Sequence, residues 1–157
     1  MKFYTIIDIS KLGYVAHKVF IRFQNLSQEK EKKFIKFIKN SPNILYSASY
    51  DGKFDIVVSI WARNVAELAK NLKELDVKFG NFIAEKQIVT ILRGEYRIRD
   101  YLIDSKTRTK RELFFGSVPQ KIKLDEINKK ILAELGKNAR ITSVEIAEKL
   151  KVSPDAI

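Results

Sequence analysis

Residues 124–157 read LDEINKKILAELGKNARITSVEIAEKLKVSPDAI. In the first part of this stretch, apolar side chains recur at steps of three and four residues: Leu124, Ile127, Ile131 and Leu135. This spacing places them on one face of an amphipathic helix, and that face needs a partner to bury it. The pattern therefore predicts a helix that packs against the residues that follow it.

A second, shorter helix is predicted to begin at Thr142. Thr142 and Glu145 have the spacing of a capping box, in which the hydroxyl accepts from the Glu145 amide and the carboxylate accepts from the Thr142 amide. The helix turns Val144, Ala147 and Leu150 inward and is barely two turns long. Ala147 is small enough for a close crossing of the two short helices.

A third helix is predicted at the end of the stretch. Ser153 suits the N-cap and Pro154 suits the first helical position. A helix, a short helix, a three-residue turn and a helix make the plan of a helix-turn-helix. On spacing alone, any small bundle of helical hairpins explains the pattern equally well.

The same stretch resembles the DNA-binding motif of the Lrp/AsnC (leucine-responsive, feast/famine) transcription regulators. The matching residues are an early aspartate, an I-L-x-x-L core, N-A-R, E-I-A-x-x-L and V-S: Asp125, Ile131, Leu132, Leu135, Asn138, Ala139, Arg140, Glu145, Ile146, Ala147, Leu150, Val152 and Ser153. Lys151 departs from the pattern, because the family usually has glycine at this turn. A side chain at positive φ there costs about 1 kcal/mol.

The resemblance implies a helix-turn-helix of the winged-helix type that binds double-stranded DNA in the intact protein. Its second helix would cross the phosphate backbone, and the helix that starts at Pro154 would enter the major groove. The expected DNA-binding residues are Arg140, Ser143, Lys149, Ser153 and Asp155. Arg140 and Lys149 are expected at phosphates, and an equal alternative for Arg140 is to tie the loop to the first helix.

The residues before this stretch have the pattern of an α+β domain. Strands are predicted at residues 3–9, 15–24, 44–50, 54–62 and 83–93, and helices after Ser27 and Asn64. The inward helical residues are Phe34, Ile35, Phe37 and Ile38 in the first helix, and Val65, Leu68, Ala69, Leu72 and Leu75 in the second. After a leading strand, the order is βαββαβ. This order predicts a ferredoxin-like sandwich, an antiparallel sheet with both helices on one face.

The other face of this sheet is predicted to be apolar as well. If alternate strand residues meet the helices, the remaining ones point away from them: Phe20, Val57, Trp61, Val89 and Ile91. An apolar face of this kind usually meets another subunit. We therefore expect a homodimer or a higher oligomer.

This part of the chain also resembles the RAM domain, the effector-binding and oligomerisation domain of the same family. The resemblance rests on I-I-D-I-S-K-L-G-Y at residues 6–14 and Y-D-G-K-F-D at residues 50–55. It implies an effector site, with a small amino acid as the ligand, at Tyr50, Gly52, Lys53, Phe54 and Asp55. The alternative is a plain hairpin turn in which the Asp55 carboxylate bonds local backbone amides.

The expected domains are a RAM-like domain at residues 1–95, a linker at 96–122 and an incomplete helix-turn-helix domain at 123–157. A typical member of the family has the helix-turn-helix first. The reversed order suggests a truncated piece of an archaeal-type tandem protein, although a natural rearrangement is an alternative. Within the linker, the basic run at residues 106–111 either contacts DNA phosphates or is a solvated loop.

Composition limits the classes of function. The net charge of +11 suits a polyanionic partner, but a lysine-rich surface of the thermophile kind explains the charge of the first half better. The sequence has no cysteine and one histidine, so we expect no metal site and no cofactor. A membrane span and a signal peptide are not expected, and the location is expected to be the cytoplasm.

An enzyme is not expected, because the acidic residues near predicted strand ends, Asp8, Asp51 and Asp55, have no nucleophile or phosphate loop to work with. The sequence instead favours a transcription regulator that binds DNA through its helix-turn-helix and assembles, and senses a small effector, through its α/β domain. The alternative is a ligand-sensing or assembly module without DNA binding of its own.

Overall fold

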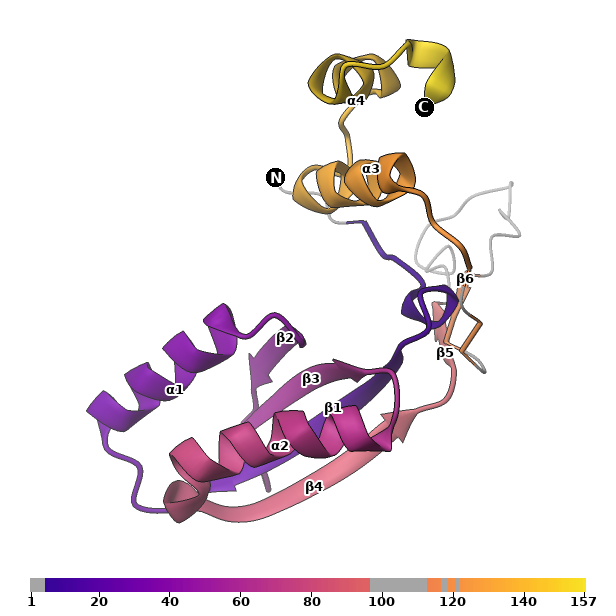
Figure 1. The fold of residues 1–157 in the computed structure, drawn as a ribbon. Coiled ribbons are helices and arrows are strands. Elements are labelled where there is room, and N and C mark those ends of the chain that lie inside the picture. Colours follow the sequence, from indigo (N-terminus) through magenta and orange to yellow (C-terminus); the bar gives the residue numbers. More distant parts are fainter. Residues whose placement is uncertain (1–4, 97–112, 117–118, 121) are drawn as a thin grey trace, which may run out of the picture. The chain divides into compact units, whose positions relative to one another are not determined.

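The computed structural model describes residues 5–96, 113–116, 119–120 and 122–157. The chain divides into two compact units, shown in Figure 1. One unit is Ile9–Gln120, and the other combines Met1–Asp8 with Lys121–Ile157. The helix-turn-helix stretch and the sheet domain therefore lie in different units.

The unit Ile9–Gln120 is built on a four-stranded antiparallel sheet. Its strands are β1 (Val15–Phe23), β2 (Ile44–Ser49), β3 (Ile56–Ala62) and β4 (Ile83–Ile91), in the order β2-β3-β1-β4. The helices α1 (Gln28–Asn40) and α2 (Val65–Phe79) cover one face of it (Figure 1). The α+β, ferredoxin-like prediction for this part of the chain is confirmed.

Both helices of this unit begin where the sequence places their caps. The Ser27 hydroxyl accepts from the Lys30 amide at 3.4 Å, and the Asn64 side chain accepts from the Glu67 amide at 2.9 Å. The Glu67 carboxylate in turn accepts from the Arg63 amide at 2.7 Å. These bonds satisfy amides that a helix leaves without a partner at its start.

The core lies between the two helices and the sheet. It is formed by residues from β1, α1, β3 and α2: Val19, Ile21, Phe34, Ile38, Ile56, Val58, Ile60, Ala62, Leu68, Leu75 and Phe79. The ring of Phe34 is fully buried and meets Phe23 and Phe79 edge-on, with centroid distances of 4.9 and 5.0 Å. Edge-to-face contacts of this kind hold α1 to α2 and to the sheet.

Two residues of α2 that the sequence predicts to be buried are exposed. Val65 is 79% exposed, and Ala69 is also exposed. The buried stripe of α2 runs through Leu68, Leu75 and Phe79. Ala69 is one residue past Leu68 and is therefore rotated about 100° away from the stripe. Val65 is the first residue of the helix and has no preceding turn to cover it.

The predicted leading strand at residues 3–9 is wrong over the described residues. Residues 5–8 are in neither a strand nor a helix, and Ile9–Lys11 form a 3-10 helix. The hydroxyl of Thr5 donates to the carbonyl of Leu135 at 2.8 Å, so this segment belongs to the unit that contains the helix-turn-helix. The predicted domain boundaries after residues 95 and 122 stay a prediction.

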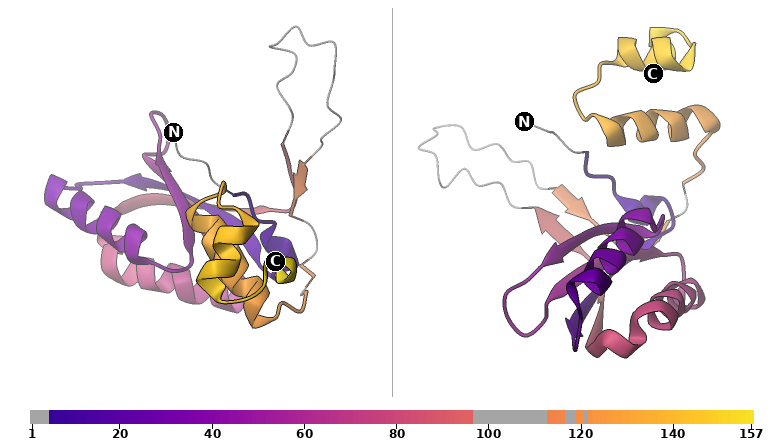
Figure 2. Two further views of the ribbon diagram at one scale, coloured as in Figure 1. Left: turned by 90° about the horizontal axis from the view of Figure 1, so that it is seen from above. Right: turned by 90° about the vertical axis from the view of Figure 1, so that its left-hand side faces the viewer.

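The predicted linker, residues 96–122, contains a strand that pairs with a strand at its start. Strands β5 (Gly94–Tyr96) and β6 (Leu113–Phe115) lie side by side as an antiparallel pair (Figure 2). Gly116 follows with φ of +79°, and a Cβ atom there would lie 3.2 Å from the carbonyl oxygen of Leu92. The basic run at residues 106–111 lies outside the described residues.

The strand register confirms which residues point away from the helices. Phe20 is paired with Val57, and Lys18 with Val89. Ala16 is flanked by Trp61 on one side and Ile91 on the other. The apolar residues expected on the second face therefore share it, although Val57 is already buried within the unit and Val89 is 37% exposed.

Candidate nucleic-acid interface and ligand loop

The first helix of the helix-turn-helix stretch is α3 (Glu126–Lys137). Its N-cap is Asp125, whose carboxylate accepts from the Asn128 amide at 2.7 Å. At the other end, the Asn138 side chain accepts from the Arg140 amide at 3.0 Å and shapes the turn to the next helix. The boundaries of α3 therefore follow from polar residues that are adjacent in sequence.

The second helix is α4 (Ser143–Leu150), and it carries the predicted capping box. The Thr142 hydroxyl accepts from the Glu145 amide at 3.2 Å, and the Glu145 carboxylate accepts from the Thr142 amide at 2.8 Å. The bond from the Thr142 amide is the main cause that lowers the pKa of Glu145. The carboxylate is therefore ionised at neutral pH. Its negative charge interacts favourably with the positive end of the dipole of α4.

The turn after α4 has the positive-φ geometry that the family resemblance implies. Lys151 is left-handed, with φ of 55° and ψ of 47°. The Val152 amide donates to the carbonyl of Ala147 at 3.1 Å. Ala147 itself is 1% exposed, which agrees with a small residue at a close crossing. A lysine thus occupies a conformation that glycine adopts at no cost, at a penalty of about 1 kcal/mol.

Some predicted details of this unit are wrong. Val144 is 51% exposed and Ile127 is 40% exposed, whereas Ile146 is buried beside Ala147. The phase of α4 therefore turns residues 146 and 147 inward. The third predicted helix is described as a 3-10 helix, Pro154–Ala156, and it has no side-chain cap bond at Ser153.

All five predicted DNA-binding residues are exposed: Arg140, Ser143, Lys149, Ser153 and Asp155. Ser143 is the first residue of α4, and Lys149 lies in its last turn. The ammonium group of Lys149 has an intramolecular partner, since it lies 2.8 Å from the Glu134 carboxylate on α3. The contact of these five residues with DNA remains a prediction.

Sequence reasoning missed Glu134. Its carboxylate also lies 2.5 Å from the ammonium group of Lys137. Hydrogen bonds from Lys137 and Lys149 lower the pKa of Glu134 to about 2. The i, i+3 spacing to Lys137 is visible in the sequence, but the contact with Lys149 depends on how α3 and α4 pack.

The predicted effector loop joins β2 to β3. Phe20 of β1 lies between two aromatic residues of this loop, 6.4 Å from the Tyr50 ring and 5.6 Å from the Phe54 ring. A Cβ atom on Gly52 would meet no other atom within 4 Å. The Gly52 φ of +159° is positive and is a value that L side chains rarely adopt, so glycine suits this position.

Two charged residues of the loop, Lys53 and Asp55, already have partners. The Asp55 carboxylate accepts from the Phe23 amide at 2.6 Å and ties the loop to β1. This agrees with a structural role for Asp55, although the amide belongs to a neighbouring strand. Lys53 lies 2.7 Å from Glu85, which Arg22 approaches at 3.4 Å. The bond from Lys53 is the largest cause that lowers the pKa of Glu85.

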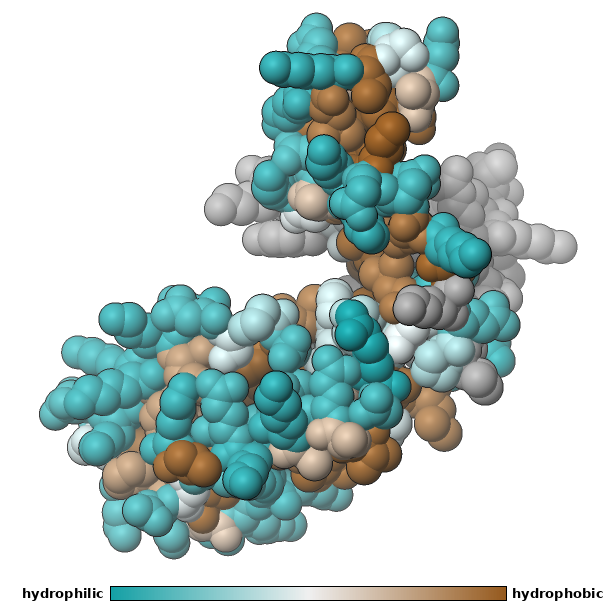
Figure 3. Space-filling model, in the orientation of Figure 1, coloured by the Kyte–Doolittle hydropathy of each residue, from teal (hydrophilic) through white to brown (hydrophobic). Residues whose placement is uncertain are grey.

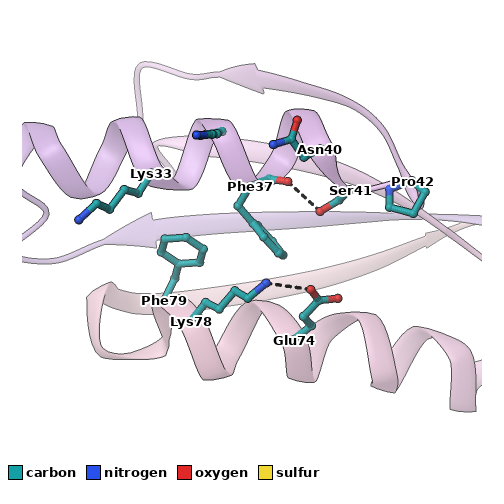
Figure 4. A pocket seen from close by; sticks show the side chains of 9 residues that line it. Lys33, Phe37, Asn40, Ser41, Pro42, Glu74, Lys78 and Phe79 are labelled. Atoms are coloured by element: carbon teal, nitrogen blue, oxygen red, sulfur yellow. Dashed lines mark hydrogen bonds and ion pairs between the residues drawn. The ribbon is translucent and has the colours of Figure 1, made fainter.

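An open groove lies elsewhere, between the C-terminal halves of α1 and α2 (Figure 4). It encloses about 440 Å³ and has Phe37 and Phe79 among its lining residues. The ammonium group of Lys78 lies 4.6 Å from the centre of the Phe37 ring and 2.9 Å from the Glu74 carboxylate. Hydrophilic side chains cover most of the visible surface of these helices (Figure 3). No predicted site residue lines this groove.

A metal-binding cluster and a membrane-spanning helix are both absent from the part of the chain that the structure describes. Its acidic and histidine side chains form no group of three that could hold a metal ion. None of its helices is long and apolar enough to cross a membrane.

Residues 124–157 match the family model of the AsnC-type helix-turn-helix domain. No curated protein matches the chain. Among solved structures, an AsnC family transcriptional regulator from Agrobacterium tumefaciens is 16% identical, with 70% of this chain and 64% of that chain covered and a TM-score of 0.50. This likeness shows a common fold.

Two further solved structures are similar at lower TM-scores. A transcriptional regulator from Neisseria meningitidis, in complex with L-Met, is 10% identical, with 58% of each chain covered and a TM-score of 0.49. AsnC from E. coli is 14% identical, with 59% of this chain and 60% of that chain covered and a TM-score of 0.48. The chain thus spans less than two thirds of the length of these structures. Through residues 124–157, the chain carries a helix-turn-helix domain of the AsnC type.

Proposed function

We propose that the chain is a transcription regulator that binds double-stranded DNA through α3, α4 and the residues after them. The observation that carries the proposal is the helix-turn-helix itself. Its second helix has a complete capping box, and the turn at Lys151 is left-handed. The match of residues 124–157 to the AsnC-type domain supports the same function.

In this proposal, α4 lies across the phosphate backbone and directs the following helix towards the major groove. Lys149, near the C-terminal end of α4, contacts a phosphate. Arg140 lies in the turn before α4 and is a second candidate for such a contact. Phosphate contacts add affinity without sequence information.

We further propose that the sheet domain assembles subunits and senses a small amino-acid-like effector at residues 50–55. The apolar second face of the sheet supports assembly. Tyr50 and Phe54 of the loop lie against Phe20. The ammonium group of Lys53 lies 5.0 Å from the centre of the Phe54 ring and 2.7 Å from the Glu85 carboxylate. Such a combination suits a ligand that carries both charges and an apolar side chain.

The DNA part of the proposal is tested by Lys149→Ala. We expect weaker binding to specific and random duplexes alike, and a salt dependence that is shallower by about one unit, because one phosphate contact is lost. Fluorescence anisotropy at several salt concentrations measures both quantities.

Lys33→Ala is the matched control for this variant. Lys33 is also an exposed lysine that is ion-paired across a helix surface, at 2.6 Å from Glu29, but it lies on α1 of the sheet domain. Its removal should leave the salt dependence almost unchanged. Equal effects of the two variants would contradict a phosphate contact at Lys149 and point to net charge alone.

A further inference from the structure

Glu134 is placed between two lysines of the helix-turn-helix unit. It projects from the second half of α3 and meets Lys137 of the same helix at 2.5 Å and Lys149 of α4 at 2.8 Å. Its side chain is only 14% exposed, whereas those of Lys137 and Lys149 are 71% and 57% exposed. The carboxylate is therefore partly enclosed, and the cations that it holds face solvent.

We propose that Glu134 is a positioning residue that competes with DNA phosphate for Lys149 and thereby limits the affinity of the helix-turn-helix for DNA. This inference rests on the proposed function, because it takes Lys149 as a phosphate contact. The inference assigns a role to Glu134 on α3, which is that it weakens the phosphate contact made by Lys149 of α4.

The competition follows from charge and geometry. A phosphate that binds Lys149 has to displace or share the Glu134 carboxylate, and the two anions repel each other at such short range. An exposed ion pair is weak, so the exchange with phosphate is readily reversible. Because the hydrogen bonds from Lys137 and Lys149 lower the pKa of Glu134 to about 2, the carboxylate is charged at neutral pH. Glu134 is therefore present as an anion that competes with phosphate under the conditions of the test below.

The test compares Glu134→Gln with Glu126→Gln. Both variants remove one carboxylate from α3 and raise the net charge by the same amount. Glu126 pairs with Lys129 at 2.5 Å, in the first turn of the helix. The matched control therefore reports the long-range effect of charge without releasing Lys149.

We expect Glu134→Gln to bind a random duplex several-fold more tightly than Glu126→Gln at low salt. The salt dependence should steepen by less than the value of about 0.9 units for a full phosphate contact, because Lys149 already makes part of that contact in the wild type. In the double variant Glu134→Gln with Lys149→Ala, this gain should disappear. The NMR signal of the Lys149 ammonium group should also shift on adding duplex, and by more in Glu134→Gln than in the wild type.

Circular dichroism checks that α3 and α4 remain folded in each variant. Glu134→Asp, which keeps the charge but shortens the side chain, serves as a second variant and should fall between the wild type and Glu134→Gln. If the wild type binds duplex and Glu134→Gln binds no more tightly than Glu126→Gln, the competition is refuted. If the wild type and all variants fail to bind duplex, the proposed function itself fails, and the inference fails with it.

Discussion

At the scale of single residues, His17 is the group whose charge state the fold constrains near neutral pH. It is the one histidine of the sequence, it lies in β1, and it is 6% exposed. Its Nδ1 atom lies 3.0 Å from the hydroxyl of Thr90 on β4. Burial lowers its pKa below the ordinary value of 6.5, because the charged form loses hydration.

We therefore expect the free energy of unfolding to fall as the pH is lowered through 6.5 and on through the folded-state pKa of His17. The unfolded chain takes up the proton first, so the folded state is the one that loses stability. Each unit of lowered pKa corresponds to about 1.4 kcal/mol. Urea denaturation at a series of pH values measures the effect.

His17→Gln should remove this pH dependence, since glutamine can still bond Thr90 but does not titrate. The carboxyl groups with a lowered pKa titrate below 4.5 and do not interfere in this window. A wild type whose stability is constant from about pH 7 to about pH 5 would rule out the buried neutral histidine.

At the scale of elements, the loop between β2 and β3 is held by its backbone and by Asp55. The Tyr50 amide donates to the Asp55 carbonyl at 2.9 Å, and the Asp55 amide donates to the carbonyl of Ile21 at 3.0 Å. These bonds leave Gly52 at the tip, where a Cβ atom would meet open space. A side chain there has space, but the φ of +159° is one that L side chains rarely adopt, so circular dichroism has to show that a variant is folded before a loss of ligand binding is interpreted.

If the loop binds an effector, Gly52→Leu should weaken that binding about tenfold or more, because the new side chain occupies the approach to the backbone. Isothermal calorimetry with the amino acids, on wild type and variant, makes the comparison. Gly80→Leu is the control, since a Cβ atom at Gly80, at the end of α2, also meets nothing within 4 Å. If none of the amino acids binds to the wild type, the loop is a plain hairpin turn.

At the scale of the whole molecule, the proposed self-association would use the sheet face away from α1 and α2. Burying apolar area stabilises an interface by about 25 cal/mol per Å². Val89 lies on this face in the second half of β4, beside Lys18 of β1. Ile88 precedes it and points to the helix side, yet it is 42% exposed, compared with 37% for Val89.

Val89→Glu should therefore raise the dimer dissociation constant at least tenfold, about 1.4 kcal/mol, because the charge must be buried between subunits. The control, Ile88→Glu, adds the same charge on the opposite face and should leave association unchanged. Sedimentation equilibrium of both variants and the wild type tests this. A wild type that sediments as a monomer at tens of micromolar, or equal effects of both variants, would place any subunit contact elsewhere.

The sequence by itself determined the features that depend on neighbouring residues. The helix starts at Ser27, Asn64 and Thr142 were predicted from cap residues, because each cap bond joins residues three positions apart. The left-handed turn at Lys151 was implied by the family resemblance, although lysine departs from the glycine that the family usually has there. The order of strands and helices sufficed for the ferredoxin-like class, since few sheet topologies are compatible with that order.

Only the tertiary structure decided which distant residues meet. The strand expected at residues 3–9 has a strand-like composition, but a strand also needs a partner, and Thr5 instead bonds Leu135, 130 positions away. Asp55 bonds the amide of Phe23, and Glu134 pairs with Lys149, across 32 and 15 positions. Contacts of this kind depend on the packing of whole elements, and local periodicity does not encode that packing.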